Sequence, residues 1–425
     1  MRFETNFNGL TPDKNAMIKK VKVEQLRPGI FVHDFNCDWK TGNHILDPSK
    51  INSTKIIDIL ISWGIKEVYI DTDRGLDVSE AKTTIELNSE TDKALQQMAA
   101  KKPKAPKNIP LREELAVAKN IKRQATTIIN TAMGDAMAGK PVETEGAYGL
   151  IEEMDKSITR NRDALVLLTR IRNKDEYTLM HSISVGAYIL NYCNTYKLPH
   201  QLTMNLAIGG LFHDIGKTKI PLNILNKPGK LTDEEFTEMK RHAEYSAAIL
   251  KDSNNLPEEA CDIALHHHER YDGNGYPHGL KGDEITFGSQ LAAIADVYDA
   301  LTSDRCYKKG IDRVEGLRKL YEWSEFHFNK DLTYKFIRCI GVYPIGTCVQ
   351  LASERIGVVI GSTENVIQPI VRIFYDNRKK LPMPTHDLDL STTEDKVVKY
   401  EDGDKWDIKK MHIFEDAIAT EILPA

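Results

Sequence analysis

The sequence lacks the features of a secreted or membrane protein. Its six cysteines include no Cys-X-X-Cys pair, so we expect reduced structural thiols and no disulfide framework or thiolate metal site. The N-terminus does not read as a signal peptide, and no run approaches the ~18 apolar residues that span a bilayer. These absences predict a cytoplasmic protein with no membrane partner.

An excess of positive charge is missing as well. The formal net charge of −5 argues against a general nucleic-acid binder, because such proteins need a strong basic field. A small phosphorylated ligand is compatible with this net charge, since it needs only a local positive pocket.

With 41% hydrophobic residues in 425, the chain can form a core, and its length suggests about two to four domains.

Apolar patterning divides the chain into four parts. Residues 1–75 combine short β-branched segments with helical spacing at 52–62, which predicts a small α/β regulatory domain. The polar stretch 76–110 ends in Lys/Pro-rich sequence and is typical of a linker. Residues 111–340 show helical spacing almost throughout, and 341–425 indicate a small β module with a C-terminal arm. The expected fold class is therefore mainly α.

One helix start is well marked within the helical part. Thr232 and Glu235 have the spacing of a capping box, in which each side chain accepts a backbone N–H of the other residue. We expect a helix to begin there and to carry Met239, His242 and Leu250.

The helical part also holds seven residues with the chemistry of metal ligands. Imidazole and carboxylate without thiolate suit Mn, Fe or Zn better than Ca or Mg. Any one of these histidines alone would more often be a hydrogen-bonded core residue, and it is their conjunction that indicates a site. Asp214 could bridge two cations through its two oxygens, and Lys217, one helical turn beyond His213, could contact a phosphate. The seven candidates are His181, His213, Asp214, His242, His267, His268 and Asp296.

Three consecutive histidines, at positions 266–268, are separated by helical phase. Successive helix residues are rotated by about 100°, so only residues three or four apart share a face. His267 and His268 fall on the apolar side of their helix, with Ile263 and Ala264. His266 instead falls on the polar side with Asp262, so we predict two ligands and one solvated neighbour.

Three motifs resemble those of the HD-GYP domain, a subgroup of the HD phosphohydrolases. They are HDIGK (213–217), HHERYDGNGYP (267–277) and ADVYDALTSDRCYK (295–308), and the resemblance covers about residues 165–340. The segments RPGIFV and VYIDTDRG resemble a domain of unknown function often found before HD-GYP domains. The resemblance implies a metal-dependent phosphodiesterase that converts cyclic di-GMP to pGpG, in some members onward to GMP.

The resemblance also implies roles for individual residues. The seven candidates would bind metal, with Asp214 bridging and a hydroxide shared by two cations attacking phosphorus. Lys217 would contact the scissile phosphate, while Arg305 and Lys308 would hold substrate phosphates. Asp299, one turn after Asp296, would orient a ligand or the nucleophilic water.

The Gly-Tyr-Pro segment that names the group is formed here by Gly275, Tyr276 and Pro277. The resemblance associates this loop with substrate access and with contacts to GGDEF-domain proteins. Glu269 and Asp272 are expected to support its conformation.

The chain departs from the family pattern at two positions. Cys306 stands where the family usually has proline, which we expect to be tolerated. Tyr177 stands one turn before His181, where trinuclear members carry a glutamate, and Glu176 is rotated from that position by about 100°. We therefore predict two divalent metals per chain, iron or manganese by family precedent.

Other functions compatible with the sequence are hydrolysis of cyclic GMP-AMP and non-catalytic binding of a cyclic dinucleotide or a GGDEF-domain partner. The complete ligand set and Lys217 favour catalysis over binding alone. Residues 111–160 could supply an interface for a homodimer.

Overall fold

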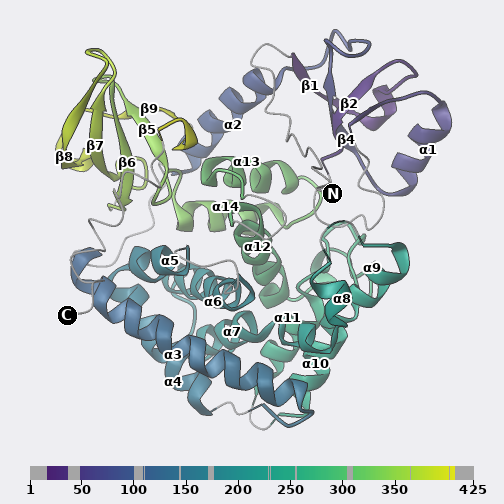
Figure 1. Cartoon of the computed structure of the whole chain (residues 1–425), viewed down its shortest axis with the longest axis vertical. Helices are drawn as coiled ribbons and strands as arrows, with labels where there is room; N and C mark the ends of the chain where they lie inside the picture. Colours follow the sequence, from purple (N-terminus) through teal and green to yellow (C-terminus); the bar gives the residue numbers. More distant parts are fainter. Residues whose placement is uncertain are drawn as a thin grey trace, which may run out of the picture. The chain divides into compact units, whose positions relative to one another are not determined.

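The computed structural model describes residues 17–36, 48–99, 109, 111–142, 145–170, 177–227, 229, 231–253, 256–303, 310–363, 365–401 and 403–406. The chain divides into two compact units. One comprises Met1–Asp92 with Gly229–Phe236, and the other comprises Lys93–Pro228 with Thr237–Ala425. Figure 1 shows the elements of both units.

The N-terminal unit contains a four-stranded antiparallel sheet in the order β1-β4-β2-β3. Helix α1 begins after Ser53, whose hydroxyl accepts a hydrogen bond from the Lys55 N–H. Apolar residues such as Val68 and Leu60 form the core. The predicted small α/β unit is confirmed. Its elements are β1 (Ile18–Lys22), β2 (Phe31–Asp34), β3 (Ser49–Lys50), α1 (Thr54–Ser62) and β4 (Glu67–Asp71).

The segment predicted to be a linker contains a helix, α2 (Thr84–Ala99). A capping box starts it: the Thr83 N–H donates to Glu86 Oε2 over 2.9 Å, and the Glu86 N–H donates to Thr83 Oγ1 over 3.2 Å. The polar composition of this segment predicted a linker, but the capping box at Thr83 favours a helix. Leu95 is buried, so the helix has an apolar side.

Helices α3 to α7 and α10 to α14 make up most of the larger unit (Figure 1). From Thr203 onward α7 is buried on every side, which fits its nearly continuous apolar sequence. The predicted helical region is confirmed. The helices are α3 (Leu111–Met137), α4 (Glu145–Arg160), α5 (Arg162–Arg170), α6 (Tyr177–Tyr196), α7 (His200–Phe212), α8 (Leu222–Leu225), α10 (His242–Lys251), α11 (Glu258–His266), α12 (Phe287–Thr302), α13 (Arg313–Trp323) and α14 (Lys330–Ile340).

The helix expected after Thr232 is broken in two. The capping box is present, with Thr232 N–H donating to Glu235 Oε2 over 2.6 Å and the Glu235 N–H donating to Thr232 Oγ1 over 3.2 Å. Helix α9 (Asp233–Lys240) then ends, and Arg241, with ψ of −14°, precedes α10. His242 is therefore the first residue of a new helix, and its ring can turn inward there.

The predicted β module is an antiparallel sheet in the order β8-β7-β6-β5-β9. Val349 and Val371 belong to the same hydrophobic core as the helices. Asp163 of α5 accepts hydrogen bonds from the backbone and side chain of Ser362, which follows β6. The strands are β5 (Cys348–Leu351), β6 (Arg355–Gly361), β7 (Ile370–Asp376), β8 (Leu381–Asp389) and β9 (Val397–Tyr400).

None of the helices described in the structure has the length and apolar character required to cross a bilayer.

Four of the six cysteines lie in the described residues, at positions 193, 261, 339 and 348. All four are buried free thiols, as the sequence predicted.

Candidate metal centre

The seven candidate ligands come from five places in the larger unit. His181 is on α6 and Asp296 on α12, while His213 and Asp214 directly follow α7. His242 begins α10, and the pair 267–268 directly follows α11. Residues far apart in the sequence thus meet because helices of one core pack together.

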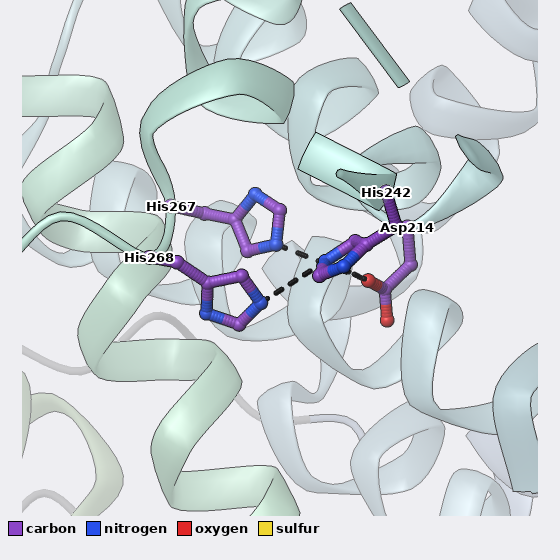
Figure 2. A group of neighbouring side chains, drawn as sticks. All are labelled: Asp214, His242, His267 and His268. Carbon is purple, nitrogen blue, oxygen red and sulfur yellow. Dashed lines mark hydrogen bonds and ion pairs between the residues drawn. The ribbon is translucent and has the colours of Figure 1, made fainter. Parts of the chain in front are cut away.

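Four of these side chains form one potential metal-binding group: Asp214, His242, His267 and His268, whose ligand atoms lie within 4.8 Å of one another. Figure 2 shows the imidazoles and the carboxylate turned toward a common centre. Nε2 of His268 lies 3.1 Å from Nε2 of His242. Oδ1 of Asp214 lies 3.4 Å from Nε2 of His242 and 3.8 Å from Nε2 of His267.

The remaining three side chains, His181, His213 and Asp296, form a second group. Nε2 of His181 lies 3.0 Å from Oδ1 of Asp296. All three side chains are buried.

Two carboxylates span both groups. While Oδ1 of Asp214 faces the first group, its Oδ2 lies 3.3 Å from Nε2 of His213 and 3.8 Å from Nε2 of His181. Asp296 behaves similarly, because its Oδ2 is 3.9 Å from Nδ1 of His268. The contact of Asp296 with His268 depends on how α12 packs, and no spacing in the sequence encodes it.

Main-chain carbonyls fix the orientation of three imidazoles. In each case Nδ1 bonds the carbonyl oxygen three residues earlier, which makes Nδ1 the donor and turns the lone pair of Nε2 inward. The distances are 2.7 Å for His213 to Gly210, 2.6 Å for His242 to Met239 and 3.0 Å for His267 to Ala264. The fourth ring, His181, bonds a carboxylate instead: its Nδ1 lies 2.8 Å from Oδ2 of Asp299.

Several inward atoms have no hydrogen-bond partner among the described residues. They are Nε2 of His213, Nε2 of His267 and Oδ1 of Asp214, all buried. Buried polar atoms normally have partners, so unpaired acceptors of this kind indicate that cations complete them. Nε2 of His267 and Oδ1 of Asp214 belong to the first group, and Nε2 of His213 belongs to the second. Their nitrogen and oxygen chemistry fits the divalent metals predicted from the sequence.

The electrostatics keep most of the ligands in the form that binds metal. Burial lowers the pKa of His242 to about 4, and burial also holds the pKa of His267 well below its ordinary value. Burial alone would raise the pKa of Asp214, but Lys217 and His213 outweigh it and hold that pKa well below its usual range. His181 differs: burial opposes its protonation, yet its bonds to Asp296 and Asp299 raise its pKa to about 9.

Lys217 reaches the site from the 3-10 turn η4 (Ile215–Lys219). Its Nζ lies 2.5 Å from Oδ2 of Asp214, and about a quarter of the side chain is exposed. Gly216 makes this approach possible, because a Cβ there would lie 2.2 Å from the His242 carbonyl oxygen. A larger residue would push the turn away from α10 and separate Asp214 from His242.

His266 lies outside both groups. Its Nδ1 is 2.8 Å from Oδ1 of Asp262 and its Nε2 is 3.1 Å from Nδ1 of His278. The side chain therefore has its own partners away from Asp214. It is only 14% exposed, so it is less solvated than the helical phase predicted.

The Gly-Tyr-Pro loop is held against the metal centre by Glu269. This buried carboxylate accepts the backbone N–H groups of His278, Gly279 and Leu280 at 2.7, 3.1 and 3.1 Å. Asp272 makes a bidentate ion pair with Arg270, with bonds of 3.1 and 2.6 Å.

Tyr276 in this loop covers one of the candidate ligands. Its ring centroid is 4.7 Å from that of His268, and its N–H donates to the His268 carbonyl oxygen over 3.2 Å. The Tyr276–Pro277 peptide bond is cis. Gly275 must be glycine here, because a Cβ would lie 2.3 Å from the Arg270 nitrogen.

Some predicted site residues lie outside the described residues. Arg305 and Lys308 belong to the segment 304–309, as does Cys306. Glu176 and the side chain of Tyr177 are also not described. Their predicted roles remain predictions.

The chain matches two known families. Residues 161–332 match the HD domain family, close to the 165–340 expected from the motifs. Residues 18–147 match a domain of unknown function, DUF3391. The latter match continues well past residue 75, where we had placed the end of the N-terminal domain, and takes in α2 and α3.

Known relatives are similar in sequence to this chain over most of its length or over part of it. A cyclic di-GMP phosphodiesterase of Pseudomonas aeruginosa is 35% identical, over 93% of this chain and 95% of the relative. A cyclic di-GMP phosphodiesterase of Vibrio cholerae is 43% identical, over 48% of this chain and 44% of the relative. The 3'3'-cGAMP-specific phosphodiesterase 2 of Vibrio cholerae is 36% identical, over 37% and 30% respectively.

Proposed function

The chain belongs to the HD-GYP group of HD-domain phosphodiesterases, and on that premise we propose that it hydrolyses cyclic di-GMP to pGpG. The observation that carries the proposal is Asp214, whose two oxygens face two separate groups of imidazoles. A relative named for cyclic di-GMP hydrolysis and similar over nearly the whole chain supports the substrate.

We infer two divalent cations per chain, iron or manganese. His242, His267 and His268 would hold one, His181, His213 and Asp296 the other, with Asp214 shared between them. When bound, such a pair supplies an activated water nucleophile and stabilises the negative charge that develops on phosphorus. Nitrogen-rich ligand sets of this kind suit these metals better than Ca or Mg.

The residues around the ligands have distinct tasks in this proposal. Lys217 neutralises Asp214 in the free protein and can turn its partly exposed ammonium toward a phosphate oxygen of the substrate. Asp299 orients His181 through Nδ1 and acts through that ring. Arg305 and Lys308 are proposed to hold the substrate's phosphates, where cations match a dianion.

The Gly-Tyr-Pro loop shapes the mouth of the site in this account. Tyr276 lies over His268, so it separates that ligand from water and limits the side from which a substrate enters. Any contact with a GGDEF-domain protein would use the same loop, because its outer face includes exposed residues such as Asn274 and Gly279.

Cyclic GMP-AMP is the second candidate substrate. It is favoured by the relative named for that activity, which is 36% identical over part of the chain. The two substrates differ in one base, and both present the same phosphodiester to the metal centre. Binding without turnover fits less well, because the ligand set and Lys217 are complete.

A product assay separates these alternatives. Purified full-length protein, loaded with Mn²⁺ or Fe²⁺, is incubated with each dinucleotide and the products are resolved by chromatography. We expect pGpG from cyclic di-GMP at a kcat/KM at least about 10-fold above that for cyclic GMP-AMP, equivalent to ~1.4 kcal/mol. The reverse preference would make cyclic GMP-AMP the proposed substrate. If neither dinucleotide is hydrolysed, the proposed phosphodiesterase activity is wrong.

A further inference from the structure

A buried arginine outside the metal centre has donors without acceptors. Arg162 is the first residue of α5, and its side chain is 6% exposed. Its Nε and Nη2 are buried and have no hydrogen-bond partner among the described residues. These atoms lie on one edge of the guanidinium and form the fork that matches the two oxygens of a carboxylate. Leaving such donors unmatched is costly, so this position calls for an acceptor.

The arginine lines a pocket between α5, α6 and the segment that follows α14. Val166 of α5, Tyr188 and Asn191 of α6 and Ile345 line it together with Arg162. The cavity of about 20 Å³ exceeds the ~10–15 Å³ that one water molecule needs. It can admit the head of a small anion, whereas a nucleotide is far too large.

The carboxylate of the neighbouring residue, Asp163, leaves the fork unsatisfied. Oδ1 of Asp163 lies 3.9 Å from Nε of Arg162, beyond hydrogen-bond distance. Both of its oxygens accept hydrogen bonds from Ser362, at 2.9 and 3.1 Å. Asp163 therefore offsets part of the positive charge of Arg162, and what the pocket lacks is a pair of acceptor oxygens.

We propose that this pocket binds a small monocarboxylate through the Nε–Nη2 edge of Arg162. The apolar side chains of Val166 and Ile345 suit a short alkyl group, and the guanidinium suits the carboxylate. Ile345 precedes β5 and Ser362 follows β6, so the ligand lies where the helices meet the C-terminal sheet. Binding there stabilises the contact between these two parts of the larger unit.

Acetate is the probe that tests the proposal. Thermal unfolding of the full-length protein is followed while sodium acetate replaces sodium chloride at constant ionic strength. We expect the Tm of the wild type to rise by about 2 °C or more at saturation, because a ligand that binds only the folded state stabilises it. Arg162→Lys keeps the charge without the fork and Arg162→Met removes both, so each should lose most of that rise.

A second measurement does not depend on the arginine variants folding. Saturation-transfer NMR on wild-type protein should detect bound acetate, and Val166→Phe, which fills the pocket, should abolish the signal. Turnover of cyclic di-GMP without acetate should stay unchanged in all three variants. Equal Tm shifts in the wild type and Arg162→Lys, a signal that persists in Val166→Phe, or a crystal structure with water alone at the fork would overturn the proposal.

Discussion

Nδ1 of His181 lies 2.8 Å from Oδ2 of Asp299, a contact that turns Nε2 of the same ring toward Asp296 and Asp214. The carboxylate thus sets both the tautomer and the direction of a candidate ligand without facing the centre itself. The candidate ligands His213, His242 and His267 differ, because main-chain carbonyls hold their Nδ1 atoms.

Removing that carboxylate should weaken one metal position. In Asp299→Ala, we expect the affinity for the cation at the His181 position to fall by about 10- to 100-fold, because the His181 ring loses its orienting partner. Asp299→Asn is the matched control, since its amide oxygen can still accept from Nδ1. Isothermal titration with Mn²⁺ measures both variants, and equal affinities in wild type and Asp299→Ala would contradict the role.

Metal binding should also depend on pH through His181. The pKa of this ring is about 9 in the metal-free protein, so near pH 7 it holds a proton that a cation must displace. Affinity at this position should therefore rise as pH increases from 7 to 9 and level off above. His242, with a pKa of about 4, carries no proton to displace over that range.

The proton released can be counted directly. Titrations in buffers of different ionisation enthalpy should show close to one proton per cation at the His181 position near pH 7, and fewer above pH 9. An affinity that is constant across pH 7–9 would contradict the assignment.

The histidine triplet offers a closely matched pair of variants. His267→Ala removes a buried imidazole whose Nε2 faces Asp214, so metal content should fall from two to about one per chain. His266→Ala removes a ring bonded to Asp262 and His278, and metal content should stay at the wild-type value. Elemental analysis of both proteins, purified in parallel, measures the metal content per chain. An equal loss of metal in the two variants would mean that His266 is a ligand too.

Gly216 should be intolerant of even a methyl group. A Cβ there would meet the His242 carbonyl oxygen at 2.2 Å, so Gly216→Ala should destabilise the protein by about 1–3 kcal/mol and lower its metal content. Gly149→Ala in α4 is the control, because its Cβ would meet nothing within 4 Å. That change should be neutral or stabilising by up to about 1 kcal/mol in urea unfolding. A Gly216→Ala protein as stable as wild type would show that η4 can move.

Glu269 should control the loop and leave the ligands in place. Glu269→Ala leaves three backbone N–H groups without their acceptor, so we expect kcat/KM to fall by about 10-fold or more while metal content is retained. Glu284→Ala is the control in the same loop, since that exposed carboxylate accepts the N–H of Lys281 alone. If both variants keep wild-type kcat/KM, the loop does not need Glu269 for its position.

Local patterns in the sequence were enough to predict much of the centre. His213 and Asp214 are consecutive in the sequence, so their closeness needs no knowledge of the fold. The separation of His266 from His267 follows from the rotation of about 100° between successive helix residues. The capping box at Thr232 can also be recognised in the sequence. The same motif at Thr83 indicates the start of α2, although the surrounding composition is polar.

Other features depend on packing between distant segments. The contact of His181 with Asp299 joins residues 118 apart, and it exists only because α6 lies against α12. The break at Arg241, which frees His242 to turn inward, has no glycine or proline to announce it. The unmatched donors of Arg162 likewise appear only when the burial of each atom is known.

The central claim is that two cations share Asp214 and that turnover requires both. The most direct test is titration of metal-free protein with Mn²⁺ or Fe²⁺, with bound metal per chain and hydrolysis of cyclic di-GMP measured on the same samples. We predict that binding saturates at two per chain, that activity appears with the second equivalent, and that Asp214→Asn loses both. Saturation at three cations, full activity with one, or wild-type turnover by Asp214→Asn would contradict the account.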